Sequence, residues 1–276
     1  MNLLRTLFYS FVMGITEILP VSSQAHQMLI SALKGGTSEP ALLRFLIHIG
    51  IGIALYLNCQ NHILRISRAQ RLSRIAKRKR TRPLDNNSLM DLRILQTTLI
   101  PIALGFINFQ RLQSLVPTLN VLSGVLLING LILYLPQYLP GSNKTSLSIS
   151  PFDSLLMGIG AVASLIPGIS CIGIVLSIAL IRGVEKLYAL NIALLMNIGM
   201  TVGWLIWDLI AMIQGGMGVT SFLGVLYAIL GGATACGATL LAIWVMKKFA
   251  ASKGFGVFAF YAWGTAMFLF ILFLSV

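Results

Sequence analysis

The chain has 276 residues, of which 57% are hydrophobic and 10% are charged, and its formal net charge is +13. An ordinary soluble domain carries about 25% charged residues. This composition, with a mean hydropathy of +0.89, therefore excludes a soluble protein and predicts an integral membrane protein. Because the alternating pattern of an outer-membrane barrel is absent, we expect a bundle of membrane-spanning helices.

The chain begins with a short pair of apolar helices. Residues 3–19 form a helix that ends at Pro20, and a second helix over about 22–33 stops at Gly35. Each helix is shorter than the roughly 20 apolar residues that cross a bilayer comfortably. Since proline cannot continue a helix, we expect a re-entrant pair that breaks at Pro20.

Six longer apolar segments are predicted to span the membrane. They lie at about 40–63, 92–110, 117–136, 187–212, 220–246 and 255–276. Between the third and the fourth of these spans lies another short pair, 152–166 and 169–181, which is broken at Pro167 and Gly168.

The segment order is a short pair, three spans, a short pair and three spans. Because three spans per half turn the second half upside down, the sequence predicts inverted repeats within a single membrane domain, 1–276. Repeat 1 covers about 1–136 and repeat 2 about 151–276. The expected fold class is all-α: a polytopic membrane protein with six transmembrane helices and two re-entrant helix-loop-helix pairs. The break "PVSSQA" also echoes the break "PGISCI", and this aligns Ser23 with Ser170.

A basic run predicts the orientation of the chain. Its members, with no acidic residue between them, are Arg65, Arg68, Arg71, Arg74, Lys77, Arg78, Lys79, Arg80 and Arg82. By the positive-inside rule we interpret residues 65–91 as a cytoplasmic loop rather than a nucleic-acid surface. Part of it is expected to form a short interfacial helix on anionic membrane lipids. The first short pair then opens to the outside.

The first break carries polar side chains within apolar sequence. In "GITEILPVSSQAH", Glu17 precedes Pro20, and Ser22, Ser23 and His26 follow it. A carboxylate inside a membrane is costly and usually marks a site. A serine is suited to cap the second helix, whose free N–H groups make a ready anion site. The spacing also places the hydroxyls and the imidazole on one helical face.

The second break, "PGISCIG", supplies another helix N-terminus. We expect Ser170 to cap it, and Gly168, which has no side chain, to let a ligand approach the backbone closely. Two converging helix ends with a carboxylate and a histidine suit the phosphate-bearing head group of a lipid. A serine or an activated water would attack phosphorus, with His26 as acid/base or nucleophile and Glu17 positioning a proton or a metal ion. Alternatively, Glu17 and His26 only cap or bridge the broken helices.

Three further titratable residues are interpreted as structural. Asp208, beside two tryptophans near the end of a span, is typical of the membrane interface. His48 is expected to be a hydrogen-bonded packing residue, and His62 is expected at the membrane surface.

Together, these motifs resemble those of the bacitracin-resistance undecaprenyl-diphosphate phosphatases. The resemblance rests on "GITEILPVSSQAH" and "SLIPGISCIGIVLSIALIRG", with support from "FLIHIGIGIALYL" and "TTLIPIALGF". It implies a multi-pass protein of the bacterial cytoplasmic (inner) membrane with two re-entrant pairs in inverted repeats. Such a protein removes one phosphate from undecaprenyl diphosphate, recycles the lipid carrier of cell-wall synthesis, and needs a divalent cation, Mg²⁺ or Ca²⁺.

The resemblance assigns roles to individual residues. Glu17 matches the second glutamate of the family's paired-glutamate motif, which makes it a catalytic and metal-binding candidate. Ser22, Ser23 and His26 match the serine pair and the histidine of that motif, and Ser170 matches the serine of the second loop. We therefore expect Glu17, Ser23 and His26 to be catalytic. The residues expected to bind substrate are Ser22, Gly168 and Ser170.

Several positions depart from the family pattern. The first glutamate falls on Met13, the loop arginine on Cys171, the next serine on Ile172 and the threonine on Val175. The arginine would clamp a phosphoryl group, and losing such a contact typically costs about 10²–10³ in rate. No lysine or arginine replaces it in either break, and Arg182 lies about three turns away along its helix.

Three hypotheses follow from the sequence. The leading one is a phosphatase that acts on a polyprenyl diphosphate. The second is a non-catalytic carrier that binds or flips a polyprenyl phosphate lipid, because inverted repeats with broken helices are typical of transporters. The third is a membrane scaffold whose site has decayed. The sequence leaves a homodimer open.

Overall fold

The structure is a computed structural model that describes residues 2–75, 79, 83–139, 143–251 and 254–275. Within these ranges the secondary structure is helical, apart from one isolated bridge between Lys144 and Val184. The α-helices are α1 (Leu3–Ile18), α2 (Ser23–Leu33), α3 (Ala41–Ser73), α4 (Asn86–Ile107), α5 (Phe109–Gln113), α6 (Leu119–Tyr134), α7 (Pro151–Ala163), α8 (Cys171–Ile181), α9 (Lys186–Gly215), α10 (Phe222–Ala251) and α11 (Val257–Ser275). Two short 3₁₀ helices are η2 (Leu135–Tyr138) and η3 (Ser146–Ser148).

The six predicted spans are confirmed among the described residues. The helices long and apolar enough to cross a membrane are Ala41–Ser73, Asn86–Ile107, Leu119–Tyr138, Lys186–Gly215, Phe222–Ala251 and Val257–Leu274. Their outer surfaces expose large apolar side chains, as lipid contact requires; Ile100, for example, is 64% exposed. The protein is therefore a multi-pass membrane protein.

The basic run differs from its predicted form. Helix α3 does not end near residue 63 but continues without interruption to Ser73, and α4 begins at Asn86. The connection is thus shorter than the predicted loop of 65–91, and no separate interfacial helix begins at Arg65. The chain contains neither glycine nor proline between Leu57 and Pro83, so nothing in this stretch breaks the helix. The remainder of the run, 76–78 and 80–82, lies outside the described residues.

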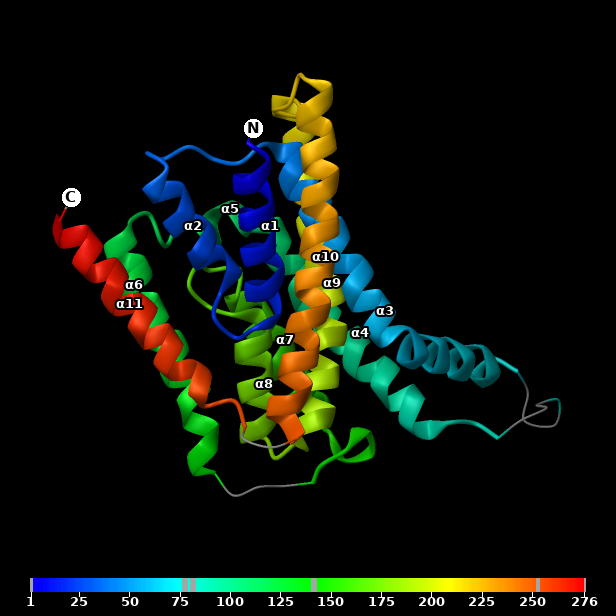
Figure 1. Cartoon of the computed structure of the whole chain (residues 1–276). Helices are drawn as coiled ribbons and strands as arrows, with labels where there is room; N and C mark the ends of the chain where they lie inside the picture. Colours follow the sequence, from blue (N-terminus) through cyan, green and yellow to red (C-terminus); the bar gives the residue numbers. More distant parts are fainter. Residues whose placement is uncertain (1, 76–78, 80–82, 140–142, 252–253, 276) are drawn as a thin grey trace.

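The two short pairs occupy the middle of the bundle. Helix α1 packs along α10 and α7 packs along α4, while α3 packs along α9 (Figure 1). Helix α3 also packs along α10, so closely that a Cβ at Gly50 of α3 would lie 2.1 Å from the carbonyl oxygen of Gly232 of α10. Helices α6 and α11 form a pair at one side of the molecule (Figure 1). The arrangement places both helix breaks inside the protein.

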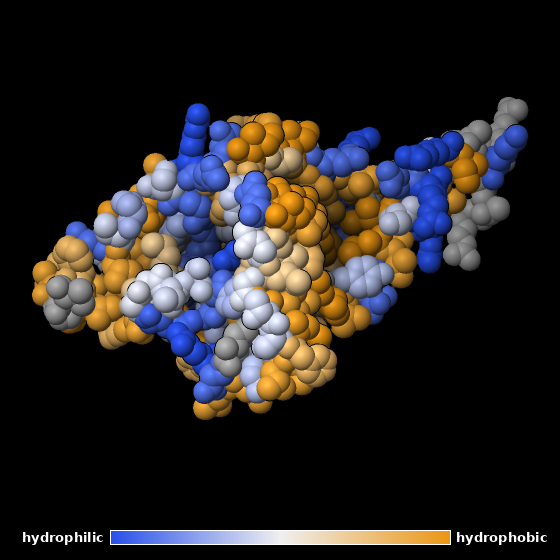
Figure 2. Space-filling view, turned by 90° about the horizontal axis from the view of Figure 1, so that it is seen from above, coloured by the Kyte–Doolittle hydropathy of each residue, from blue (hydrophilic) through white to orange (hydrophobic). Residues whose placement is uncertain are grey.

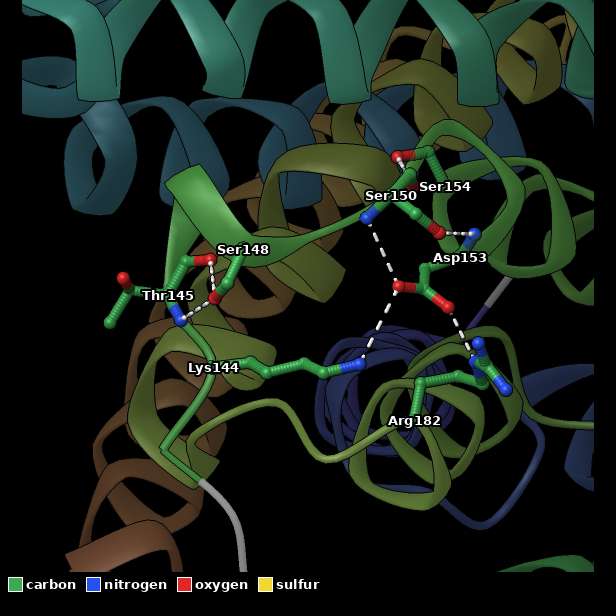
Figure 3. Close-up of polar contacts among 7 residues, drawn as sticks. All are labelled: Lys144, Thr145, Ser148, Ser150, Asp153, Ser154 and Arg182. Atoms are coloured by element: carbon green, nitrogen blue, oxygen red, sulfur yellow. Dashed lines mark hydrogen bonds and ion pairs between the residues drawn. The ribbon is translucent and has the colours of Figure 1, made fainter.

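A buried carboxylate holds the far end of the second short pair. Asp153, which is 1% exposed, forms a capping box with Ser150 at the start of α7. It also pairs with Arg182 at the end of α8 and, at 3.9 Å, with Lys144 (Figure 3). The arginine nearest to the second break along α8 is therefore bound to a carboxylate at the opposite end of that helix.

His62 makes a polar contact that the sequence did not indicate. Its side chain is 17% exposed, and its Nε2 lies 2.7 Å from Asp91 Oδ2. The hydroxyl of Tyr188 donates to the same carboxylate. His62 therefore takes part in a polar contact that joins α3, α4 and α9, because a carboxylate on an apolar span needs partners. The place of His62 at the membrane surface stays a prediction.

Candidate functional site

The two helix breaks lie against each other. The backbone N–H of Gly168 donates to Ser22 Oγ at 3.2 Å. Asn129 of α6 connects both breaks: its Oδ1 accepts from the Ser170 N–H at 3.0 Å, and its Nδ2 donates to the Pro20 carbonyl at 3.5 Å. The expected meeting of the two breaks is thus confirmed.

Local backbone geometry explains how each break begins its second helix. Ser22 has a φ of +64°, the only positive value among the described non-glycine residues, and its Oγ accepts from the N–H of Ala25 at 3.4 Å. Gly168 has a φ of +103°, which a residue with a side chain rarely adopts. Ser170 then caps α8, since its Oγ accepts from the N–H of Gly173 at 3.2 Å. Each break therefore ends in a serine-capped helix N-terminus.

Glu17 and Ser23 form the chemically distinctive contact. The hydroxyl of Ser23 donates to Glu17 Oε2 at 2.6 Å. The amide of Asn197, a fully buried residue of α9, donates to Glu17 Oε1 at 3.4 Å. A serine hydroxyl that donates to a carboxylate has a base within reach of its proton, which is the arrangement of an activated nucleophile.

Two glutamines hold the breaks together around this contact. Gln24 Nε2 donates to the carbonyl of Ser164 at 3.1 Å. Gln113 Nε2, from α5, donates to Gln24 Oε1 at 2.7 Å and to the carbonyl of Leu165 at 2.8 Å. The sequence interpretation missed Gln113, because an amide in a short connecting helix carries no motif.

Two neighbouring cavities adjoin the Glu17–Ser23 contact. A small cavity of about 20 Å³ reaches Ser170 and Cys171, and a larger one of about 330 Å³ leads away from it. Both are lined by Glu17, Ser23, Gln24 and Trp204. The larger volume lies at the lower end of the range for small-ligand sites. Figure 2 shows hydrophilic side chains gathered around a hollow on the face seen from above, with hydrophobic side chains on the flanks.

His26 is not brought to these cavities. Its Nδ1 lies 2.8 Å from the carbonyl oxygen of Ser22, and its Nε2 lies 2.8 Å from the hydroxyl of Tyr261 on α11. Because a carbonyl only accepts, Nδ1 carries the hydrogen, and in the neutral ring Nε2 accepts from the tyrosine. His26 lines a separate, mostly apolar cavity of about 360 Å³ between α1, α2 and α11. Its acid/base role stays a prediction.

Two of the four positions that depart from the family pattern line the cavities. Met13 lines the larger cavity and Cys171 the smaller one. The structure therefore places an apolar and a neutral side chain where the resemblance predicts a carboxylate and a guanidinium. Among the described residues, no group of three His, Cys, Asp or Glu side chains could hold a metal ion.

The structure adds a cluster of charged residues to the wall of the larger cavity. Asp208, expected at the membrane interface, is 2% exposed and pairs with Arg44 and His48. Lys34 and Glu39 form a second ion pair on the same wall. The sequence did contain a signal, because a carboxylate within an apolar span needs a cationic partner. It could not identify that partner.

Comparisons with a family model and with curated relatives point to the same family. The family model for bacitracin resistance protein BacA matches residues 6–268. A relative named undecaprenyl-diphosphatase from Desulforudis audaxviator is 28% identical over 265 residues, 95% of this chain and 94% of its own. Relatives with the same name are 30% identical over 208 residues in a Nocardioides species, covering 75% of each chain, and 27% identical over 282 residues in Methanobrevibacter smithii, covering 98% of each.

Proposed function

This chain belongs to the bacitracin resistance protein BacA family, and we propose that it hydrolyses undecaprenyl diphosphate to undecaprenyl phosphate and inorganic phosphate. The observation that carries this proposal is the 2.6 Å hydrogen bond from Ser23 to Glu17 at the junction of the two cavities. The relatives named undecaprenyl-diphosphatase support the choice of substrate. Removal of the terminal phosphate would recycle the lipid carrier of cell-wall synthesis.

The contacts support a nucleophilic route. Ser23 Oγ attacks the terminal phosphorus while Glu17 takes its proton, and the polyprenyl phosphate leaves with the electrons of the broken P–O bond. Water then releases inorganic phosphate from the serine. Negative charge on the phosphoryl oxygens is stabilised by the free N–H groups at the start of α8, which Ser170 and Gly168 position.

A divalent cation, Mg²⁺ or Ca²⁺, fits this site. Asn197 Oδ1 is buried and has no hydrogen-bond partner among the described residues, and Asn197 already contacts Glu17. Glu17 and this amide oxygen would hold the ion, since Mg²⁺ is often bound by one or two carboxylates together with substrate phosphates. The ion would neutralise charge on the diphosphate. Cys171 and Met13 offer no ligand of that kind.

We also propose that the two short pairs are re-entrant and that the chain is built of inverted repeats. The packing supports this. If α1 corresponds to α7 and α4 to α10, the α1–α10 contact has its counterpart in the α7–α4 contact. The remaining equivalent helices pack against their own counterparts, α3 against α9 and α6 against α11. Arg44 at the start of α3 lines the cavity. The basic residues Arg65 to Arg74 lie at the other end of this 33-residue helix, about 30–45 Å from Arg44 along its axis. The site therefore opens on the outer face of a bacterial inner membrane, and Arg65 to Arg74 contact anionic lipids inside.

Phosphate release by the purified chain tests this function. We expect release from undecaprenyl or farnesyl diphosphate in the presence of Mg²⁺ or Ca²⁺. Ser23→Ala and Glu17→Gln should lower the rate at least about 10³-fold, because each removes one member of the nucleophile–base pair. Ser154→Ala is the matched control, since the hydroxyl of this buried serine donates to the Ser150 carbonyl and to no other group among the described residues.

Two results would contradict the proposal. One is phosphate release that persists at the wild-type rate in both Ser23→Ala and Glu17→Gln. The other is binding or flipping of undecaprenyl phosphate by wild-type protein that hydrolyses neither diphosphate, which would favour the carrier.

A further inference from the structure

The two helix breaks of the site carry no cationic side chain. A diphosphate head group carries several negative charges, and neither break contains a lysine or an arginine. Arg182 is bound to Asp153 at the other end of α8 (Figure 3). A cationic side chain that binds the head group, in addition to a metal ion, must therefore come from another element of the cavity wall.

Among the described residues, the permanently charged cations that line the larger cavity are Lys34 and Arg44. Lys34 pairs directly with the carboxylate of Glu39. Arg44 donates from Nε to Asp208 Oδ1 at 3.2 Å and from Nη1 to the carbonyl of Glu39 at 3.2 Å. Because a guanidinium has five N–H donors, the contacts within the described chain leave three of them for a ligand.

The guanidinium of Arg44 is held in place from α9. Asp208 is 2% exposed, and its second oxygen lies 2.6 Å from His48 Nδ1. The ring of His48 stacks on Trp204 at 5.7 Å between centroids, with 8° between the planes. A fixed carboxylate thus orders the arginine before any ligand arrives, which lowers the entropy cost of binding.

The same cluster adjoins the reacting groups. Trp204, on which His48 stacks, lines both the larger cavity and the small cavity that contains Ser170. Glu17 and Ser23 line both cavities as well. An anion that reaches Ser23 through the larger cavity therefore passes the wall that carries Arg44.

We propose that Arg44, oriented by Asp208, is the cation that binds the diphosphate head group in this chain. The inference rests on the proposed function and identifies the side chain whose positive charge binds the diphosphate at the same site. A guanidinium binds two phosphate oxygens through parallel hydrogen bonds, which a lysine cannot imitate. Arg44 is thus a substrate-binding residue, Asp208 is a positioning residue, and His48 supports Asp208.

Binding of inorganic pyrophosphate to the purified full-length chain tests this inference independently of turnover. We expect Arg44→Gln to weaken pyrophosphate affinity about 10- to 100-fold and to raise the KM for farnesyl diphosphate by a similar factor. The affinity of Arg44→Lys for pyrophosphate should lie between those of wild type and Arg44→Gln, because lysine keeps the positive charge and loses the paired donors of the guanidinium. Arg5→Gln, an exposed arginine of α1 outside the cavity, is the control and should bind as wild type does.

A double variant separates binding from folding. Arg44→Gln leaves the buried carboxylate of Asp208 with His48 as its remaining partner among the described residues, so Arg44→Gln/Asp208→Asn removes the buried charge and should show the same loss of affinity. Wild-type affinity in either folded variant would overturn the inference, as would wild-type protein that releases phosphate without binding pyrophosphate. Pyrophosphate binding that depends on Arg44 in a protein without phosphatase activity would instead overturn the proposed function alone.

Discussion

Two buried aspartates in this protein make similar ion pairs in different surroundings. Asp208 and Asp153 are 2% and 1% exposed, and each holds an arginine from another helix. Arg44 lines the cavity that contains Glu17, whereas Arg182 stacks over Phe152 at 5.8 Å and joins the ends of α7 and α8. We infer from the comparison that a buried ion pair in this protein indicates function only when a cavity reaches its cation.

The largest expected effect separates these two pairs. Asp153→Asn and Asp208→Asn should each cost about 2 kcal/mol of stability, because each removes a charge partner from a partly buried arginine. For a chain of this size, that corresponds to a melting temperature in detergent lower by about 5 °C. Only Asp208→Asn should also raise the KM for farnesyl diphosphate, by about 10-fold, with kcat nearly unchanged. An equal rise in KM for Asp153→Asn would remove the distinction.

Restoring an arginine at the second break should have an effect of similar size and opposite sign on kcat/KM, without the loss of stability. Cys171 lines the small cavity beside Ser170, so Cys171→Arg would place a guanidinium near the phosphoryl group. We expect kcat/KM to rise about 10-fold, less than the 10²–10³ of an optimised contact, because Arg44 already supplies a cation. Cys236→Arg on α10, away from both cavities, is the control. No gain in Cys171→Arg would mean that the pocket cannot accept the larger side chain.

The smallest effect is expected at His26. Both of its ring nitrogens are bonded outside the Glu17 cavity, to Ser22 and to Tyr261. If His26 braces α2, His26→Ala should lower kcat about fivefold and Tyr261→Phe about twofold. A general acid or base contributes about 10²–10⁴. A loss of that size in His26→Ala, with little change in Tyr261→Phe, would show that the ring turns into the cavity during the reaction.

The sequence predicted the elements of the fold correctly because their signals are local. A run of about 20 apolar residues marks a span, and a proline marks a break, whatever lies elsewhere in the chain. The predicted and observed ends of α3 differ because no glycine or proline marks the end of this helix, which continues through the basic residues to Ser73. The same local logic singled out Glu17 and Ser23, six residues apart across one break.

The sequence by itself thus determined that this is a membrane bundle with two polar helix breaks, and it named the carboxylate and the serine that face each other. Tertiary structure alone decided which distant residues complete the site. Arg44 meets Asp208 across 164 positions and Asn197 meets Glu17 across 180. It also decided that His26 turns toward α11. The physical reason is that such pairs depend on how α1, α3 and α9 pack together, and no pattern within a single helix encodes that packing.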